Sequence, residues 1–219
     1  GENPYELQNI LKYWVRSKND DLKVIPTDSI VMKVDKEAVR RSGMMIPGDS
    51  IPDYMHISLK GKRALYKSEL MMLEMLAEAN WERPIYMAVS VGTENHLGMG
   101  NHFVQEGLTY RFTPFDTEKT GVKLDSEKMY DNLMNKFKFG GIDKEGIYID
   151  ENAMRMCYSH RRIFSQLIGQ LIREGKTDKA KAALEYAEKM IPAYNVPYDW
   201  QNGAMQMAEA YYQLGEKEK

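Results

Sequence analysis

The sequence has very little cysteine and no excess of charge of one sign. Cys157 is the single cysteine in 219 residues, which excludes an internal disulfide and any zinc cluster built from several cysteines but leaves the compartment open. The 30 lysines and arginines balance 32 aspartates and glutamates. Such a balance gives no strong field for attracting nucleic acid or an acidic membrane surface, so neither is expected as a partner.

Long hydrophobic runs and familiar catalytic motifs are also missing. The longest nearly apolar stretches, such as residues 70–77, contain glutamates and are far shorter than the roughly 20 residues that cross a bilayer. No basic start followed by an apolar run opens the chain, so any targeting signal is expected outside this sequence. The Gly-x-Ser-x-Gly elbow, the Walker loop and the zinc-protease helix are absent. A self-contained hydrolase or kinase is therefore not expected, and no cofactor is predicted.

The first half of the chain has the pattern of an α/β domain. Hydrophobic residues make up 43% of the sequence, enough for a real core. Residues 85–91 are apolar almost throughout, which is typical of a strand buried on both faces. Alternating strands and helices predict a small mixed or parallel sheet with helical crossovers. The expected strands cover 29–34, 54–59, 85–91 and 107–115, and the expected helices start at Pro4 and cover 36–42 and 63–80.

The second half is helical from Ser126 onward, apart from a short link at 146–150. We therefore expect an α/β domain over 1–122 and a helical region over 123–219. Landmarks in 161–192 follow the tetratricopeptide spacing, in which large residues such as Phe164 face small ones such as Ala180. Gly175 suits the turn between the two helices.

The same landmarks start again near Ala204 and continue to Gly215, but the second helix of that repeat does not follow. A first helix without its partner exposes an apolar face, which repeat proteins normally cap. We expect either that more repeat follows in the natural chain or that another surface covers this face.

Two segments carry polar side chains that could support chemistry. The glycine-rich "GTENHLGMGNHFVQE" contains Glu94, His96, His102 and Glu106, whose spacing matches no standard metal-ligand pair. Its "GMG" lacks the rest of a dinucleotide fingerprint. A flexible surface loop is the favoured interpretation, and no metal is expected.

The second polar segment is "YIDENAMRMCYSHRRIF" at 148–164. On a helix, Cys157 and His160 fall on one stripe with Ala153, Met156 and Phe164, which favours core packing over a nucleophile pair. Three arginines project from other faces, namely Arg155, Arg161 and Arg162. They could bind a carboxylate or phosphate, and pairing with Asp150 and Glu151 is the favoured interpretation.

Several stretches in order resemble the C-terminal region of a family of large multi-spanning bacterial membrane proteins. That family contains a domain of unknown function and is similar to protein O-mannosyltransferases. The resemblance runs from about Pro4 to the end and rests on "WERPIYMAV", "HFVQEGLTYRFTPF", "YIDENAMRMCYSHRRIF", "MIPAYNVPYDW" and "MAEAYYQLGEKEK".

The resemblance implies transmembrane helices upstream and a soluble part on the extracytoplasmic (periplasmic) side of a bacterial inner membrane. It also implies that the catalytic loop lies elsewhere, so this segment has an accessory role, such as binding a protein or peptide acceptor or mediating assembly. The alternative is a stand-alone tetratricopeptide module that binds peptides without sugar chemistry. The triplet "DSI" occurs twice and resembles a bacterial O-glycosylation acceptor pattern, which makes modification of Ser29 or Ser50 a hypothesis.

Overall fold

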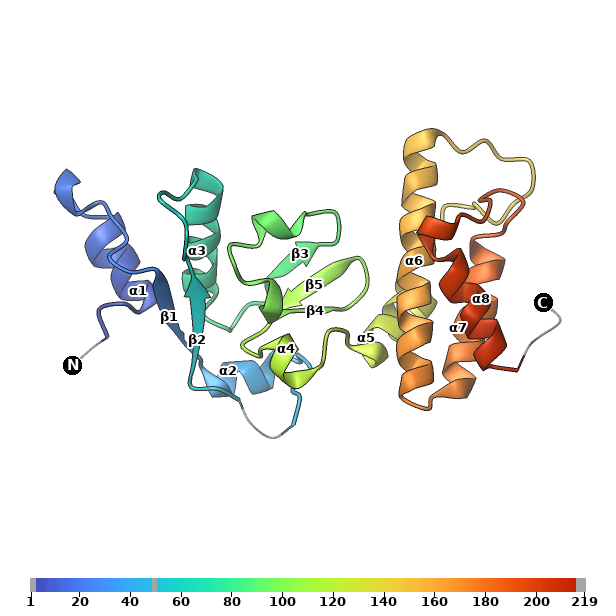
Figure 1. Cartoon of the computed structure of the whole chain (residues 1–219), viewed down its shortest axis with the longest axis horizontal. Coiled ribbons are helices and arrows are strands. Elements are labelled where there is room, and N and C mark those ends of the chain that lie inside the picture. The colour runs from blue at the N-terminus through green and yellow to red at the C-terminus, as the bar shows by residue number, and fades with distance from the viewer. Residues whose placement is uncertain (1–2, 49–50, 216–219) are drawn as a thin grey trace. The chain divides into compact units, whose positions relative to one another are not determined.

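The computed structural model of the chain describes residues 3–48 and 51–215. These residues form two compact units (Figure 1). The first unit contains the residues up to 104 together with 109–123, and the second contains 105–108 together with the residues from 124 onward. The chain therefore passes from one unit to the other three times. The sequence analysis expected domains at 1–122 and 123–219, and whether each of these parts folds by itself stays a prediction.

The first unit opens with a short helical segment whose apolar stripe is buried. Helix α1 (Leu7–Asn9) continues as the π-helix η1 (Ile10–Val15), and the 3-10 turn η2 (Asp20–Leu22) follows. Leu7, Ile10 and Leu11 are all buried. The helix expected after Pro4 is therefore present, although it begins only at Leu7.

A two-stranded antiparallel sheet lies at the centre of this core. Strand β1 (Ser29–Lys33) pairs with β2 (Tyr54–Ser58), and helix α2 (Lys36–Arg41) lies between them in sequence. Buried and more exposed residues alternate along both strands, so one face of the sheet is buried. Ile30 and Ile57 face each other in the register and are completely buried. Helix α3 (Lys67–Ala79) packs Leu73 and Leu76 into the same core.

The second sheet of this unit has three short strands in the order β3-β5-β4. They are β3 (Tyr86–Ala88), β4 (Phe103–Gln105) and β5 (Thr109–Phe112), and β3 pairs with β5 in antiparallel fashion. Buried Trp81 stacks on Phe112 with ring centroids 5.3 Å apart. The 3-10 turns η3 (Thr93–Asn95) and η4 (Gly100–His102) precede β4, and helix α4 (Thr117–Thr120) follows β5.

The fold class is mixed α and β, but the expectation of a small mixed or parallel sheet with helical crossovers is wrong. Both strand pairs whose direction is defined, β1–β2 and β3–β5, are antiparallel. The strand expected at 85–91 is not buried on both faces either, because β3 is an edge strand and Tyr86 is 43% exposed. A short apolar run is compatible with a buried parallel strand or with an antiparallel edge, and composition alone does not separate the two.

The second unit is helical, as the sequence predicts. Its helices are α5 (Ser126–Asp131), the π-helix η5 (Asn132–Lys136), α6 (Glu151–Arg173), α7 (Thr177–Met190), the 3-10 turn η6 (Trp200–Asn202) and α8 (Ala204–Gln213). Helix α6 packs against α7 and α8. Phe164 and Ala180 have no exposed surface, and Gly175 takes a positive φ of 71° in the turn between α6 and α7.

Helix α8 buries one side and exposes the other. Met207 and Ala210 are buried, whereas Met205 is 52% and Tyr212 is 68% exposed. The partner helix expected for α8 would lie beyond Gly215, outside the described residues, so the tetratricopeptide assignment stays a prediction. Across residues 3–48 and 51–215, no helix has both the length and the apolar character that crossing a bilayer requires.

Candidate functional site

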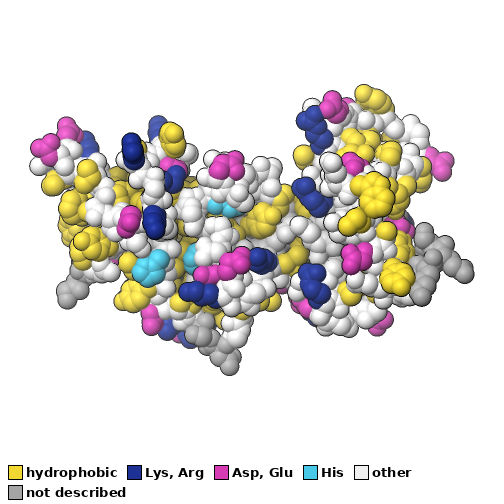
Figure 2. Space-filling model, viewed as in Figure 1, with side chains coloured by type: hydrophobic (Ala, Val, Ile, Leu, Met, Phe, Trp, Pro, Cys, Tyr) yellow, Lys and Arg dark blue, Asp and Glu magenta, His cyan; other side chains and the backbone are white. Residues whose placement is uncertain are grey.

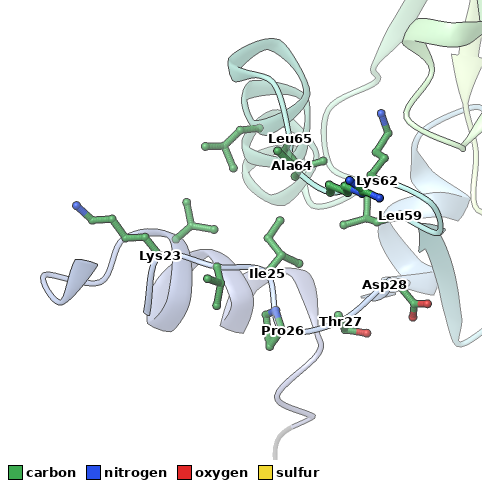
Figure 3. Close-up of a pocket in the computed structure, with 13 residues that line it drawn as sticks. Lys23, Ile25, Pro26, Thr27, Asp28, Leu59, Lys62, Ala64 and Leu65 are labelled. Atoms are coloured by element: carbon green, nitrogen blue, oxygen red, sulfur yellow. The ribbon is translucent and has the colours of Figure 1, made fainter. Parts of the chain in front are cut away.

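An open groove of about 770 Å³ lies in the first unit between two chain segments (Figure 3). One wall is the linker 23–28, between η2 and β1, and the other is the segment 59–65 before α3. We call it the linker groove. The main-chain N–H of Leu59 donates to the carbonyl of Asp28 over 2.7 Å and so ties the two walls together at one end. Val15 and Leu70 complete the lining.

The linker groove is mainly apolar. Ile25 points toward the opposite segment, which carries Leu59 and Ala64 (Figure 3). Val24 also lines the groove and is 49% exposed. The sequence analysis did not find this site, because its walls are loops more than thirty residues apart. The only local signal was the apolar "VIP" at 24–26, within a stretch otherwise rich in polar residues.

The lysines at the rim of the linker groove are held in ion pairs. Lys62 lies 2.5 Å from Glu69, and Lys23 lies 2.5 Å from Asp20. The hydrogen bond from Lys62 and that from the main chain of Tyr66 lower the pKa of Glu69 despite its burial. Figure 2 shows basic and acidic side chains interspersed on this face of the unit. Arg63 also lines the groove, so the groove combines apolar contact with basic side chains.

The glycine-rich segment is not simply a surface loop, because residues 93–95 are exposed but several of the residues that follow them are buried. His96 is 5% exposed and packs against Phe103, with ring centroids 5.1 Å apart. Leu97 and Met99 are buried as well. Gly98 has a φ of +67°, and a Cβ there would lie 2.7 Å from the carbonyl oxygen of Ser58. Glycine thus serves here for close packing against β2 rather than for flexibility.

The four candidate ligands of that segment have separate environments. Glu94 is exposed, whereas Glu106 is buried and lies 3.1 Å from Lys128. His96 and His102 are both buried, and Glu106 belongs to the second unit while the histidines belong to the first. In the part of the chain that the structure describes, no three His, Cys, Asp or Glu side chains are arranged to hold a metal ion.

His102 lies in a second hollow of the first unit, which we call the β2 cleft. The cleft has a volume of about 380 Å³ and lies between residues 52–56 and the segments 101–102 and 114–120. Burial lowers the pKa of His102, and the neighbouring Asp116 carboxylate opposes this effect. The ring is therefore held neutral at neutral pH.

We expect the stability of the chain to depend on pH through His102. In the unfolded chain the ring takes up a proton near pH 6.5, whereas in the folded chain it does so only at lower pH. Below about pH 6.5 unfolding is therefore coupled to proton uptake, and the free energy of unfolding falls by up to ~1.4 kcal/mol per pH unit. Urea denaturation at pH 7.5 and 5.5 measures this loss, which His102→Gln should reduce. An equal loss of unfolding free energy in the variant would show that His102 does not cause the pH dependence.

The predicted packing of Cys157 and His160 on helix α6 is confirmed only in part. Cys157 is buried, and burial raises the pKa of its thiol. His160 is half-buried and lies edge-on to Phe137, with ring centroids 5.9 Å apart. The prediction is wrong for the N-terminal part of the stripe, because Ala153 and Met156 are exposed. The first turns of α6 are thus less buried than helical spacing alone suggested.

The predicted arginine pairings are right for Arg155 and wrong for Arg161. Arg155 forms an ion pair with Glu151, while Asp150 caps α6 by accepting hydrogen bonds from two main-chain N–H groups. Arg161 is only 1% exposed. Its guanidinium donates to the carbonyls of the segment that follows α7, namely those of Ile191, Val196 and Pro197. It is therefore a structural residue of the second unit.

The two serines proposed for modification differ in what the structure says of them. Ser29 is the first residue of β1 and is half-buried, and its Oγ lies 3.5 Å from Nδ1 of His56. Ser50 lies outside the described residues. Modification of either serine stays a prediction.

Comparison with known proteins places this chain in a family. A family model described as TMEM260-associated domain 2 matches residues 2–132, which is more than half of the chain. Both the linker groove and the β2 cleft lie within the matched residues. No curated protein and no solved structure gives a significant match. The description ties the family to a membrane protein, and the chain belongs to the TMEM260-associated domain 2 family.

Proposed function

We propose that this chain is a non-catalytic accessory region of a membrane glycosyltransferase similar to protein O-mannosyltransferases. In this proposal it lies on the extracytoplasmic side of a bacterial inner membrane and binds acceptor proteins. The observation that carries the proposal is the family match over residues 2–132, which ties this part to a membrane protein. The sequence resemblance described above is the reason for proposing that this membrane protein is a glycosyltransferase.

The linker groove supports a binding role for a protein segment. Its volume of about 770 Å³ falls in the range of known ligand sites, roughly 300 to 1,000 Å³. A lipid-linked sugar donor carries phosphates, which require cations that are not already paired. Lys23 and Lys62 are both paired with carboxylates, whereas Val24 and Ile25 offer apolar contact. Arg63 lines the groove as well, but most of the lining residues are apolar, so an apolar stretch of an acceptor protein fits the groove better than a sugar phosphate.

We expect charge in the linker groove to reduce glycosylation by the full-length protein. Val24→Glu and Ala64→Glu place carboxylates on two exposed positions of the groove wall, where they disfavour apolar contact. In the native host we expect the fraction of secreted acceptor protein carrying sugar, measured by mass spectrometry, to fall at least threefold. Both positions are solvent-accessible, so the fold should tolerate the changes.

Met71→Glu provides the matched control. Met71 is 56% exposed on α3 and does not line the linker groove. Its replacement should leave glycosylation unchanged. Equal sugar occupancy in the groove variants and the wild type, with intact expression, would contradict acceptor binding in the groove. A host strain lacking the gene but retaining full glycosylation would contradict the glycosyltransferase itself.

A tetratricopeptide-type peptide-binding module is the second candidate, and one observation favours it. Small residues on α7, among them Ala180, Ala183 and Ala187, are buried where α7 packs on α6. This large-against-small packing is what the tetratricopeptide pattern requires. Under this alternative, loss of the whole gene would change no protein-bound sugar.

A further inference from the structure

The outer edge of β2 presents main-chain groups in a regular pattern. At the two ends of the β1–β2 pair, the N–H of Val34 donates to Asp53 over 2.9 Å and the N–H of Leu59 donates to Asp28 over 2.7 Å. In an antiparallel strand, successive residues direct their N–H and C=O groups to opposite sides. Odd-numbered residues of β2 therefore bond to β1. Tyr54, His56 and Ser58 direct their main-chain groups away from β1.

The corresponding edge of β1 is covered, whereas that of β2 is largely open. On β1, the N–H of Val31 donates to Tyr5, and the indole of Trp81 donates to the carbonyl of Lys33 over 2.8 Å. On β2, Gly98 lies against the carbonyl of Ser58. Within residues 3–48 and 51–215, no strand pairs with the outer edge of β2, and the outward main-chain groups of Tyr54 and His56 make no hydrogen bond.

The open edge faces the β2 cleft. Pro52, Tyr54 and His56 form one wall of this 380 Å³ hollow. The opposite wall includes Phe115 and Asp116, which lie beside α4. The unpaired edge is therefore one side of a defined hollow rather than part of a flat surface.

The acidic side chain opposite the edge, Asp116, is already engaged. The carboxylate of Asp116 caps α4 by accepting from the N–H groups of Glu118 and Lys119, over 2.9 and 3.2 Å. It also accepts a hydrogen bond from the side chain of Asn101. A small polar ligand would have to displace these bonds. Besides the side chains of Lys119 and His102, the cleft offers main-chain groups of β2 at strand spacing.

We propose that the outer edge of β2 binds an extended segment of a partner polypeptide, which adds to the β1–β2 sheet as a third strand. Exposed strand edges are templates for such pairing, and peptide-binding domains use it widely. The cleft has a second wall that includes Phe115 and Asp116, and such a walled hollow admits an isolated extended segment more readily than the sheet edge of a second copy of this chain. This inference concerns a surface distinct from the linker groove and does not rest on the proposed function.

The test uses the whole chain and decapeptides selected on it from a random displayed library. His56→Pro removes one outward N–H. It removes no hydrogen bond to β1, because the N–H of His56 is directed away from β1. Proline is also tolerated at strand edges. His56→Ala keeps the N–H and removes only the side chain. We expect the Kd of a selected peptide to rise at least tenfold with His56→Pro and to change less than threefold with His56→Ala.

A second measurement keeps the proposal testable if His56→Pro lowers the melting temperature. N-methylation of single peptide bonds in the selected decapeptide should weaken binding at alternate residues only, because every second N–H of the added strand faces β2. Failure to select any peptide would overturn the proposal. So would equal affinity of the proline and alanine variants, a methylation profile without period two, or a wild-type dimer that His56→Pro dissociates.

Discussion

Arg161→Ala should destabilise the second unit by about 3 to 5 kcal/mol. The guanidinium donates to three main-chain carbonyls at 2.6 to 3.0 Å and lies 4.6 Å from the ring centroid of Tyr198. Alanine would leave these carbonyls without donors in the interior and would create a cavity. Urea denaturation followed by circular dichroism, which reports the helices, measures the loss.

Two other variants show whether the hydrogen bonds cause this effect. Arg161→Lys keeps the charge but lacks the planar fork that reaches several carbonyls at once, so we expect an intermediate loss. Arg155→Ala removes an exposed arginine of the same helix, and its ion pair with Glu151 should contribute less than about 1 kcal/mol. If Arg161→Ala is no more destabilising than Arg155→Ala, the anchoring role is wrong.

Ala180→Trp should destabilise the pair of helices α6 and α7 by about 3 kcal/mol or more. Ala180 has no exposed surface, and the helices pack closely around it. An indole at this position would force the helices apart or push side chains from their preferred rotamers. Thermal denaturation of the purified chain should show a clear decrease in melting temperature for the helical unit.

The same substitution at an exposed alanine is the control. Ala153 lies in the first turn of α6 and is exposed, so Ala153→Trp should cost only the small difference in helix propensity, about 0.5 kcal/mol. Equal melting temperatures for the two tryptophan variants would show that Ala180 is not at a packed interface.

Local sequence patterns predicted the individual helices and strands better than their arrangement. Short runs rich in apolar and β-branched residues between turn formers correctly predicted β1 and β2, and helical spacing predicted α3 and α6. The direction of strand pairing depends on contacts between distant segments, which a local pattern does not contain. Strand β4 was missed because Phe103 follows a run of glycines, which normally indicates a loop.

The candidate site was harder to predict than the fold. The linker groove forms from two loops whose residues carry no catalytic motif, and they become neighbours only when Leu59 bonds to Asp28. The burial of Arg161 was also missed. A charged residue on a helix is usually exposed, and its carbonyl partners lie thirty or more residues further along the chain.

The short excursion of residues 105–108 into the second unit limits how the protein can be divided. Glu106 is buried and lies 3.1 Å from Lys128. A shortened chain ending at residue 123 would keep this carboxylate and discard the ammonium that compensates it. Loss of this charge partner would favour hydration or protonation of the acid. For separate expression of the first unit, Glu106 should be replaced by glutamine. Gene fusions or domain swaps cannot use one cut point here, because the chain crosses between the units three times.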